Sequence, residues 1–248
     1  MKKPIVIAFS SQKGGAGKTT LTQLVATYLF SQQMKIMVVD ADYPQHSFSR
    51  SRLRDLTPPA DHPDLLAALA ERGITPYPVE TMKMDDLIRV LPHLRTSANY
   101  DLIFLDLPGT LNVDNFHLLA RQIDMVVVPF ELEFKSYVAG MDTVDFYQNY
   151  NPDMPIAAIW TKLKTPHKVN FRKSLENTMV EKGVNVFTAF LKETVQIGDQ
   201  ISTIFPLKHF IEKIVDELMN TKTLLCLKSE NSSNKQPIAT TEPVVMAS

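Results

Sequence analysis

The chain has 248 residues, of which 44% are hydrophobic and 21% are charged, and its net charge at neutral pH is −1. This length suits one large domain with a sizeable core. The balanced charge excludes a surface that attracts nucleic acid or membrane as a whole, so any such contact must come from a local patch. The single cysteine, Cys226, excludes an intramolecular disulfide and a cysteine-ligated metal site formed by one chain.

The sequence predicts no signal peptide and no segment that spans a membrane. Met1-Lys2-Lys3 leads straight into an apolar strand, so we expect no signal peptide. No apolar run approaches the roughly 18 residues that a membrane span needs. We therefore expect a cytoplasmic protein with one domain over 1–227 and a disordered tail over 228–248, where polar residues and proline prevail.

Residues 4–20 organise the chain, because they place a strand, a glycine-rich loop and a helix in immediate succession. The apolar run Ile5–Phe9 predicts a buried strand of a parallel sheet. The glycines at 11–17 let the backbone turn and bring its N–H groups close to an anion. The helix that opens at Lys18 adds the positive end of its dipole. This order predicts a triphosphate cradle rather than an ordinary glycine turn before a helix.

The nucleotide-binding residues expected in this cradle are Gly14, Gly15, Ala16, Gly17, Lys18, Thr19 and Thr20. Lys18 should reach the β- and γ-phosphates of ATP, and the Thr19 hydroxyl should ligate Mg²⁺. The usual pattern of a glycine, four residues and Gly-Lys-Ser/Thr fails at its first position, where Gln12 stands. A lysine, Lys13, directly precedes the glycines instead.

This loop, Lys13-Gly14-Gly15-Ala16-Gly17-Lys18-Thr19, resembles the deviant Walker A motif of the ParA/MinD family of ATPases. The resemblance covers roughly residues 3–220. In that family a second lysine reaches the partner subunit's nucleotide in an ATP-sandwich homodimer, and Lys13 occupies its position. The resemblance implies catalytic roles for Lys13 and Lys18, ATP and Mg²⁺ as cofactors, and an α/β fold. That fold is a P-loop NTPase whose mostly parallel central sheet is flanked by helices.

A second predicted strand, Lys35–Asp40, ends in a carboxylate and continues as Asp40-Ala41-Asp42-Tyr43-Pro44-Gln45. Ligands of open α/β sheets lie at that edge, and two acids there suit a Mg²⁺-phosphate site, although a helix cap or turn uses the same residue types. The segment resembles the family's switch I, with Tyr43 inserted before the proline. The resemblance implies that Asp42 orients the attacking water and that Asp40 contacts the Mg²⁺ shell.

The next stretch is mainly helical. Arginines gather in Ser49–Asp55, and we interpret them as the solvated face of a helix. Helical periodicity predicts further helices over 64–72 and 84–94, with a short strand near 74–79 between them. The histidines of this half show no metal-ligand spacing.

The strongest interior strand is Tyr100–Asp106, which ends in Asp106-Leu107-Pro108-Gly109. An acid that closes an apolar strand before a glycine turn is the Walker B and switch II arrangement. Asp106 should therefore hold Mg²⁺ through water, and the Gly109 amide should sense the γ-phosphate.

The second half predicts strands over 123–129, 155–160 and 184–188, and helices over 134–150 and about 207–220. The apolar positions of the first helix are expected in the core; they are Val138, Met141, Val144 and Tyr147–Tyr150. By analogy with the family, Pro206 lies against the nucleotide base. The asparagine with which family members read adenine has no counterpart after Trp160.

Lys162–Lys173 contains five lysines and arginines among twelve residues, and no acid. Such a segment is either a non-specific DNA surface that neutralises phosphates or the solvated start of a helix. The residues that would contact DNA are Lys164, Lys168, Arg172 and Lys173.

Two functions remain open. A ParA-like partitioning or positioning ATPase would form a homodimer with ATP, bind DNA non-specifically, and turn over slowly until a partner protein activates it. The likeness is greatest to ParA-type proteins of plasmids and conjugative transposons, which implies a role in transfer or maintenance of a mobile element. A MinD-like switch would instead end in an amphipathic helix on the membrane. Because Lys222–Lys228 is short and a polar tail follows it, membrane binding is the less favoured alternative.

Overall fold

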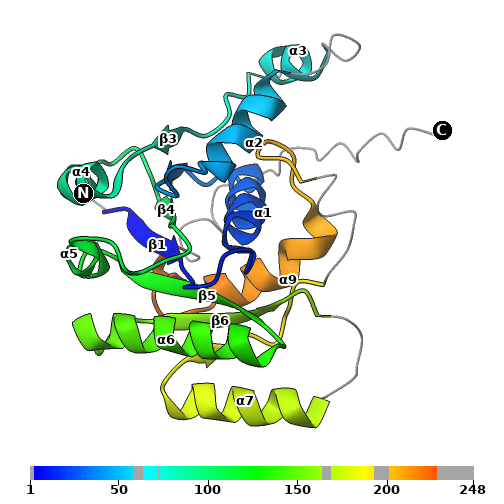
Figure 1. Cartoon of the computed structure of the whole chain (residues 1–248). Coiled ribbons are helices and arrows are strands. Elements are labelled where there is room, and N and C mark those ends of the chain that lie inside the picture. The colour runs from blue at the N-terminus through cyan, green and yellow to red at the C-terminus, as the bar shows by residue number, and fades with distance from the viewer. Residues whose placement is uncertain (1–2, 58–63, 72, 164–168, 193–200, 228–248) are drawn as a thin grey trace.

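The computed structural model describes residues 3–57, 64–71, 73–163, 169–192 and 201–227 (Figure 1). Its centre is a seven-stranded sheet with the strand order β3-β2-β4-β1-β5-β6-β7, and all the paired strands are parallel. The strands are β1 Ile5–Phe9, β2 Ile36–Asp40, β3 Val79–Thr81, β4 Leu102–Asp106, β5 Met125–Glu131, β6 Ile156–Thr161 and β7 Asn185–Val186. The expected α/β fold with a parallel central sheet is confirmed.

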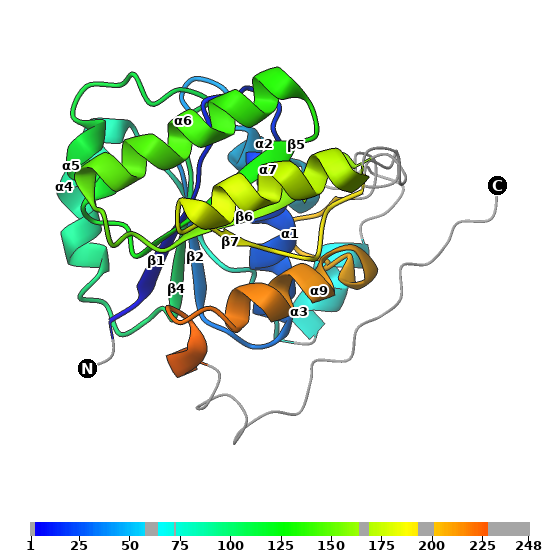
Figure 2. The ribbon, with the colours of Figure 1, turned by 90° about the horizontal axis from the view of Figure 1, so that it is seen from below.

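Helices cover both faces of the sheet. They are α1 Lys18–Ser31, α2 Ser47–Leu56, α3 Asp64–Glu71, α4 Met84–Leu94, α5 Phe116–Ala120, α6 Phe134–Tyr150, α7 Val169–Glu181 and α9 Lys208–Met219. Figures 1 and 2 show α6 and α7 running across one face, with α1 and α9 on the other. No helix in the described ranges is long and apolar enough to cross a membrane.

The apolar strands are buried on both faces, because side chains alternate between the two faces of a sheet. In β1, Ile7 and Phe9 pack in the core that also holds α1 and α9. Val6 and Ala8 pack on the opposite side, in the core that holds α4, α5 and α6. Parallel strands that lie between two helical layers need this unbroken apolar character, which the sequence shows.

The centre of the sheet is a topological switch point. β1 pairs with β4 on one side and with β5 on the other. The chain after β1 builds β2 to β4 on one side before it crosses to β5, β6 and β7. Ligands of open α/β sheets bind where the strand order reverses, at the carboxyl ends of the strands. The loop that follows Phe9 lies at this point.

Most predicted elements lie where they were expected, but three details were wrong. The third strand is Val79–Thr81 and shares only Val79 with the predicted strand at 74–79, because Pro76 and Pro78 have no N–H to donate to a ladder. Val138 and Tyr150 are each 39% exposed instead of lying in the core, whereas Met141, Val144 and Tyr147 are buried. Arg52 is only 8% exposed, so the arginines of α2 do not form one solvated face. The predicted tail, 228–248, lies outside the described residues.

Gly140 lets α6 lie close to the sheet. A Cβ at this position would overlap the ring of Phe130, which is fully buried in β5. We expect Gly140→Ala to lower the free energy of unfolding by about 1–3 kcal/mol, because overpacking outweighs the helix propensity that alanine adds. Urea denaturation followed by circular dichroism measures this change. Phe130→Leu in the Gly140→Ala background should recover part of the loss, whereas a more stable single variant would contradict the close contact.

Candidate functional site

A cavity of about 770 Å³ opens at the carboxyl ends of the central strands. Its lining is Gly14, Gly15, Gly17, Lys18, Thr19, Thr20, Gln23, Asp42, Tyr43, Pro44, Gln45, Ser47, Ser51, Pro108, Gly109, Thr110 and Lys162. The structure thus brings together the glycine loop, the acidic segment after β2 and the glycine turn after β4. The sequence assigned all three segments to one phosphate site.

The glycine loop has the backbone that a phosphate cradle requires. Gly15 and Gly17 have φ angles of 73° and 94°, a region that favours glycine. Gly17 caps α1 without a side-chain hydrogen bond, and the first hydrogen bond of this helix runs from Leu21 N–H to the Gly17 carbonyl. The N–H groups of the first turn therefore have no partner within the helix, which is the arrangement that binds anions at helix N-termini.

Lys18 is a buried cation at the floor of the cavity. Burial lowers the pKa of its ammonium group, while the charges of Asp106 and Asp42 act in the opposite direction. A buried lysine is costly unless negative charge accompanies it. The group is therefore placed to gain from a phosphate in the cavity.

Thr19 and Asp106 form the centre of the site. The Thr19 hydroxyl donates a hydrogen bond of 2.8 Å to Asp106 Oδ2. The other carboxylate oxygen, Oδ1, is buried without a hydrogen-bond partner in the described structure. Burial raises the pKa of Asp106 to about 7, and the Thr19 hydrogen bond opposes this effect.

These oxygens fit the needs of Mg²⁺, which prefers a few protein oxygens and completes its shell with water and phosphate. A divalent cation would also favour the ionised form of a carboxylate whose burial otherwise opposes ionisation. The described residues contain no group of three or more histidine, cysteine or acidic side chains that could hold a metal ion alone. A Mg²⁺ ion at Thr19 and Asp106 would therefore depend on a bound phosphate.

Asp40 lies beside Asp106, since these residues are paired in the register of β2 and β4. Its fully buried carboxylate accepts hydrogen bonds from the N–H of Asp42 at 3.2 Å and of Ser49 at 2.8 Å. His46 Nδ1 lies 3.5 Å from Asp40 Oδ1. Asp40 therefore anchors the acidic loop and the first turn of α2, which corresponds to the cap or turn that the sequence left open as the alternative for these acids. Its contact with the Mg²⁺ shell stays a prediction.

Asp42 lines the cavity, as its predicted role requires. Burial raises the pKa of its carboxyl, while the charge of Lys18 acts in the opposite direction. The inserted Tyr43 is 60% exposed, and its ring meets His46 edge to face at 5.7 Å between centroids. The insertion therefore leaves Asp42 in the cavity, on the side facing Lys18.

Lys13 lies outside this lining and contacts two acids at the end of β5, the last strand residue Glu131 and Glu133 just beyond it. Its Nζ is 2.5 Å from Glu131 Oε2 and 3.0 Å from Glu133 Oε2. The hydrogen bond with Glu131 is the main reason why the pKa of Lys13 is raised. Lys162 shares the same partner, with its Nζ 2.7 Å from Glu131 Oε1 and 2.6 Å from the Gly15 carbonyl. Sequence reasoning assigned no role to Glu131 or Glu133, and it counted Lys162 only as part of the basic segment 162–173.

The remaining predicted residues are Ala16, Pro206 and the four basic residues of the 162–173 segment. Ala16 is buried within the loop, where its carbonyl accepts a hydrogen bond of 3.1 Å from the Thr161 hydroxyl. Pro206 is not among the described residues that line the cavity. Arg172 and Lys173 lie on α7, and Arg172 forms an ion pair of 3.0 Å with Glu176. Lys164 and Lys168 fall outside the described residues.

Sequence comparisons find one matching family and several similar proteins, two of which are named as partitioning proteins. The family described as an AAA domain matches residues 4–92. The chromosome partitioning protein ParA of Myxococcus xanthus is 28% identical over 181 residues, which cover 62% of this chain and 63% of that protein. The chromosome-partitioning ATPase Soj of Thermus thermophilus is 29% identical over 160 residues, which cover 54% of this chain and 59% of that protein. The chain therefore matches less than two thirds of the length of either relative.

Solved structures share the fold. The MinC:MinD cell division protein complex of Aquifex aeolicus gives a TM-score of 0.66 at 19% identity and covers 88% of this chain and 97% of that chain. A putative plasmid partition protein of Borrelia burgdorferi bound to AMPPNP gives a TM-score of 0.60 at 20% identity, and the match covers 88% of this chain and 99% of that chain.

The pKa of Asp106 predicts how stability without nucleotide depends on pH. Because burial raises this pKa from 3.8 to about 7, the folded chain keeps a proton that the unfolded chain has lost between these values. Its contribution to the free energy of unfolding should therefore fall as pH rises through this window, by up to about 1.4 kcal/mol per pH unit. Asp106→Asn cannot ionise and should remove this part of the slope.

Urea denaturation of the wild type and Asp106→Asn at pH 5, 6, 7 and 8, without nucleotide or Mg²⁺, measures the difference. Equal slopes for the two proteins would contradict a buried carboxyl with a raised pKa.

Proposed function

The chain belongs to the ParA/MinD family of ATPases, and from this premise we propose that it is an ATP-driven dimerisation switch that hydrolyses ATP to ADP with Mg²⁺. The switch would act in the partitioning, positioning or conjugative transfer of a mobile DNA element. Its ATP-bound homodimer would bind DNA without sequence preference, and a partner protein would stimulate hydrolysis.

One observation carries this proposal: Lys18 and Thr19 line a cavity beside a glycine loop, and the buried Asp106 accepts the hydrogen bond of Thr19 behind them. The loop amides and Lys18 would bind the β- and γ-phosphates, and Thr19 and Asp106 would hold Mg²⁺. Bound Mg²⁺ would neutralise charge on the phosphates. Asp42, which lines the same cavity, would orient the attacking water. Catalysis of this kind depends on position and charge, so slow turnover is expected while a partner protein is missing.

Lys13 explains how dimerisation would depend on ATP. The lysine is held by two carboxylates of its own chain, Glu131 and Glu133. A partner's triphosphate would offer it a stronger concentration of negative charge. Lys13 would therefore leave these acids only when a second, ATP-loaded copy faces it.

The alternative membrane-bound switch lacks a free anchor in the described part of the chain. In the apolar segment Lys222–Leu227, Leu224 and Leu227 are buried in the core with α9. An interfacial helix must present its apolar side to lipid, and these two residues are already packed. Non-specific DNA is therefore the surface that we propose.

Two lysine variants separate nucleotide binding from dimerisation. Lys18→Ala should weaken ATP binding by at least about tenfold, because a charge-assisted contact with phosphate is lost. Lys13→Ala should bind ATP with nearly wild-type affinity yet stay monomeric. Isothermal titration calorimetry and light scattering with AMPPNP measure the two properties, with Lys35→Ala, an exposed lysine elsewhere, as the matched control. Unchanged affinity of Lys18→Ala would refute the cradle, and a dimer of Lys13→Ala would refute the role of this lysine.

DNA binding is tested best in Asp42→Ala, which should bind ATP and persist as a dimer because hydrolysis is blocked. Co-sedimentation with DNA of random sequence should require ATP and weaken with salt. Replacing Lys164, Lys168, Arg172 and Lys173 with alanine should reduce both affinity and the salt slope. The control removes the same charge from the scattered residues Lys3, Lys35, Lys213 and Lys222. Equal effects of the two quadruple variants would show that the 162–173 segment is not a DNA surface.

A further inference from the structure

Helix α2 spans from the cavity to a distant segment of the chain, 201–205. Phe48, Arg52 and Asp55 are spaced at i, i+4 and i+7, which places them on one face of the helix. Phe48 and Arg52 are buried, and the side chain of Asp55 is 10% exposed. This face therefore points into the protein, and two of its three residues are charged.

Arg52 holds Thr203 by side chain and backbone together. Its Nε donates a hydrogen bond of 2.8 Å to the Thr203 hydroxyl, and a second guanidinium nitrogen donates one of 3.1 Å to the Thr203 carbonyl. A further bond reaches the Tyr77 carbonyl, and the guanidinium carbon lies 4.3 Å from the centre of the Tyr77 ring. A buried guanidinium with this many partners fixes the position of both residues.

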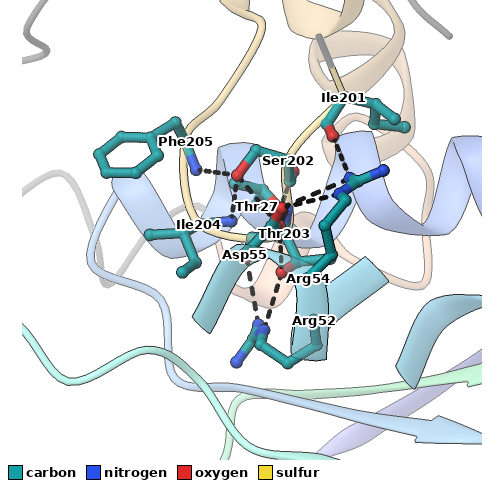
Figure 3. A network of polar contacts seen from close by, with 9 residues as sticks. All are labelled: Thr27, Arg52, Arg54, Asp55, Ile201, Ser202, Thr203, Ile204 and Phe205. Atoms are coloured by element: carbon teal, nitrogen blue, oxygen red, sulfur yellow. Dashed lines mark hydrogen bonds and ion pairs between the residues drawn. The ribbon is translucent and has the colours of Figure 1, made fainter. Parts of the chain in front are cut away.

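Asp55 holds the same threonine from the other side. One oxygen of its carboxylate accepts hydrogen bonds from the Thr203 N–H at 2.6 Å, the Thr203 hydroxyl at 2.8 Å and the Ser202 hydroxyl at 3.2 Å. The Ser202 Oγ in turn accepts the N–H of Ile204 and Phe205 at 3.0 and 3.2 Å. Figure 3 shows these contacts together with Thr27 of α1 and with Arg54, which donates to the Ile201 carbonyl.

The N-terminal end of α2 is fixed by the buried carboxylate of Asp40. Ser49, in the first turn, donates its N–H to Asp40 Oδ2, and Asp42 donates its N–H to Oδ1 of the same residue. Both oxygens of Asp40 are thus used by the acidic loop and the helix. The ten residues of α2 correspond to a rod about 15 Å long, so a shift at one end is carried to the other.

We propose that α2 is a coupling element that releases the segment 201–205 when Mg²⁺-nucleotide occupies the cavity. Each oxygen of Asp40 already accepts one N–H, from Ser49 or from Asp42, so a Mg²⁺ shell that draws on this carboxylate competes with these bonds. A ligand that draws Asp40 toward Thr19 and Asp106 therefore removes an anchor from the first turn of α2. The clasp that Arg52 and Asp55 form on Thr203 then opens more often. This inference rests on the proposed function in two respects, which are that ATP and Mg²⁺ occupy the cavity and that Asp40 contacts the Mg²⁺ shell.

The coupling follows the general rule that a ligand shifts a conformational equilibrium only by its different affinity for the two states. In the state with the clasp closed, Asp40 accepts the N–H groups of Asp42 and Ser49. In the state with the clasp open, the carboxylate of Asp40 faces the Mg²⁺ shell instead. The backbone of 201–205 is the readout, because the N–H groups of Thr203, Ile204 and Phe205 are hydrogen-bonded only through Asp55 and Ser202 in the contacts described.

Hydrogen–deuterium exchange of the full chain, with and without Mg²⁺ and AMPPNP, tests the proposal. Peptides from the glycine loop, 13–21, should exchange more slowly with nucleotide. Peptides from 201–207 should exchange at least about threefold faster, because opening of the clasp exposes their amides. Protection of the loop with unchanged or slower exchange at 201–207 would overturn the coupling alone. No protection of the loop would overturn the proposed function and the coupling together.

Variants of the clasp make the test specific. Asp55→Ala should exchange rapidly at 201–207 without nucleotide and should show no further acceleration with it. Thr203→Val, which keeps the volume and loses only the hydroxyl, should show a smaller effect in the same direction. In both variants the glycine-loop peptides, 13–21, should still exchange more slowly with nucleotide. Arg50→Ala changes an exposed residue of the same helix and should behave as the wild type. A full nucleotide response in Asp55→Ala would overturn the proposal.

Discussion

The site depends on two buried carboxylates that are paired across neighbouring strands of the sheet. Asp40 and Asp106 end the neighbouring strands β2 and β4, are paired across them, and are inaccessible to solvent. Two like charges in such a place need donors or cations close by. The acidic loop and α2 supply the donors to Asp40, whereas Thr19 is the one hydrogen-bond donor that the described residues offer the carboxylate of Asp106, and they leave its other oxygen unpaired. The first turns of α1 and α2 therefore lie beside the two carboxylates, to which Thr19 and Ser49 donate hydrogen bonds.

The same electrostatic reasoning separates the two lysines of the glycine loop. Lys18 is buried, burial lowers its pKa, and its charge faces the cavity. Lys13 is partly exposed, its pKa is raised, and its charge is shared with acids outside the cavity. A cation of the first kind favours a ligand in its own chain's cavity. A cation of the second kind must exchange one set of anions for another, which suits a residue that acts across an interface.

The sequence predicted what depends on neighbouring residues and missed what depends on distant ones. The strand, glycine loop and helix at 4–20 follow from local patterns, and so do the strands that end in Asp40 and Asp106. Lys13 and Glu131 are 118 positions apart, and Arg52 and Thr203 are 151 apart, so no periodicity connects them. Arg52 was interpreted as solvated because arginine is seldom buried without partners, and its partners Tyr77 and Thr203 lie 25 and 151 positions further along the chain.

The order of strands explains why segments distant in the sequence meet near the carboxyl end of β1. β1 lies between the half that contributes β2 to β4 and the half that contributes β5 to β7, so loops of both halves gather at its carboxyl end. Glu131 and Lys162 come to the glycine loop from the second half, and the 201–205 segment comes to α2. Two polar connections therefore join the halves. One ends at the glycine loop itself, where Lys162 donates to the Gly15 carbonyl, and the other reaches the cavity only through α2, whose Ser47 and Ser51 line it.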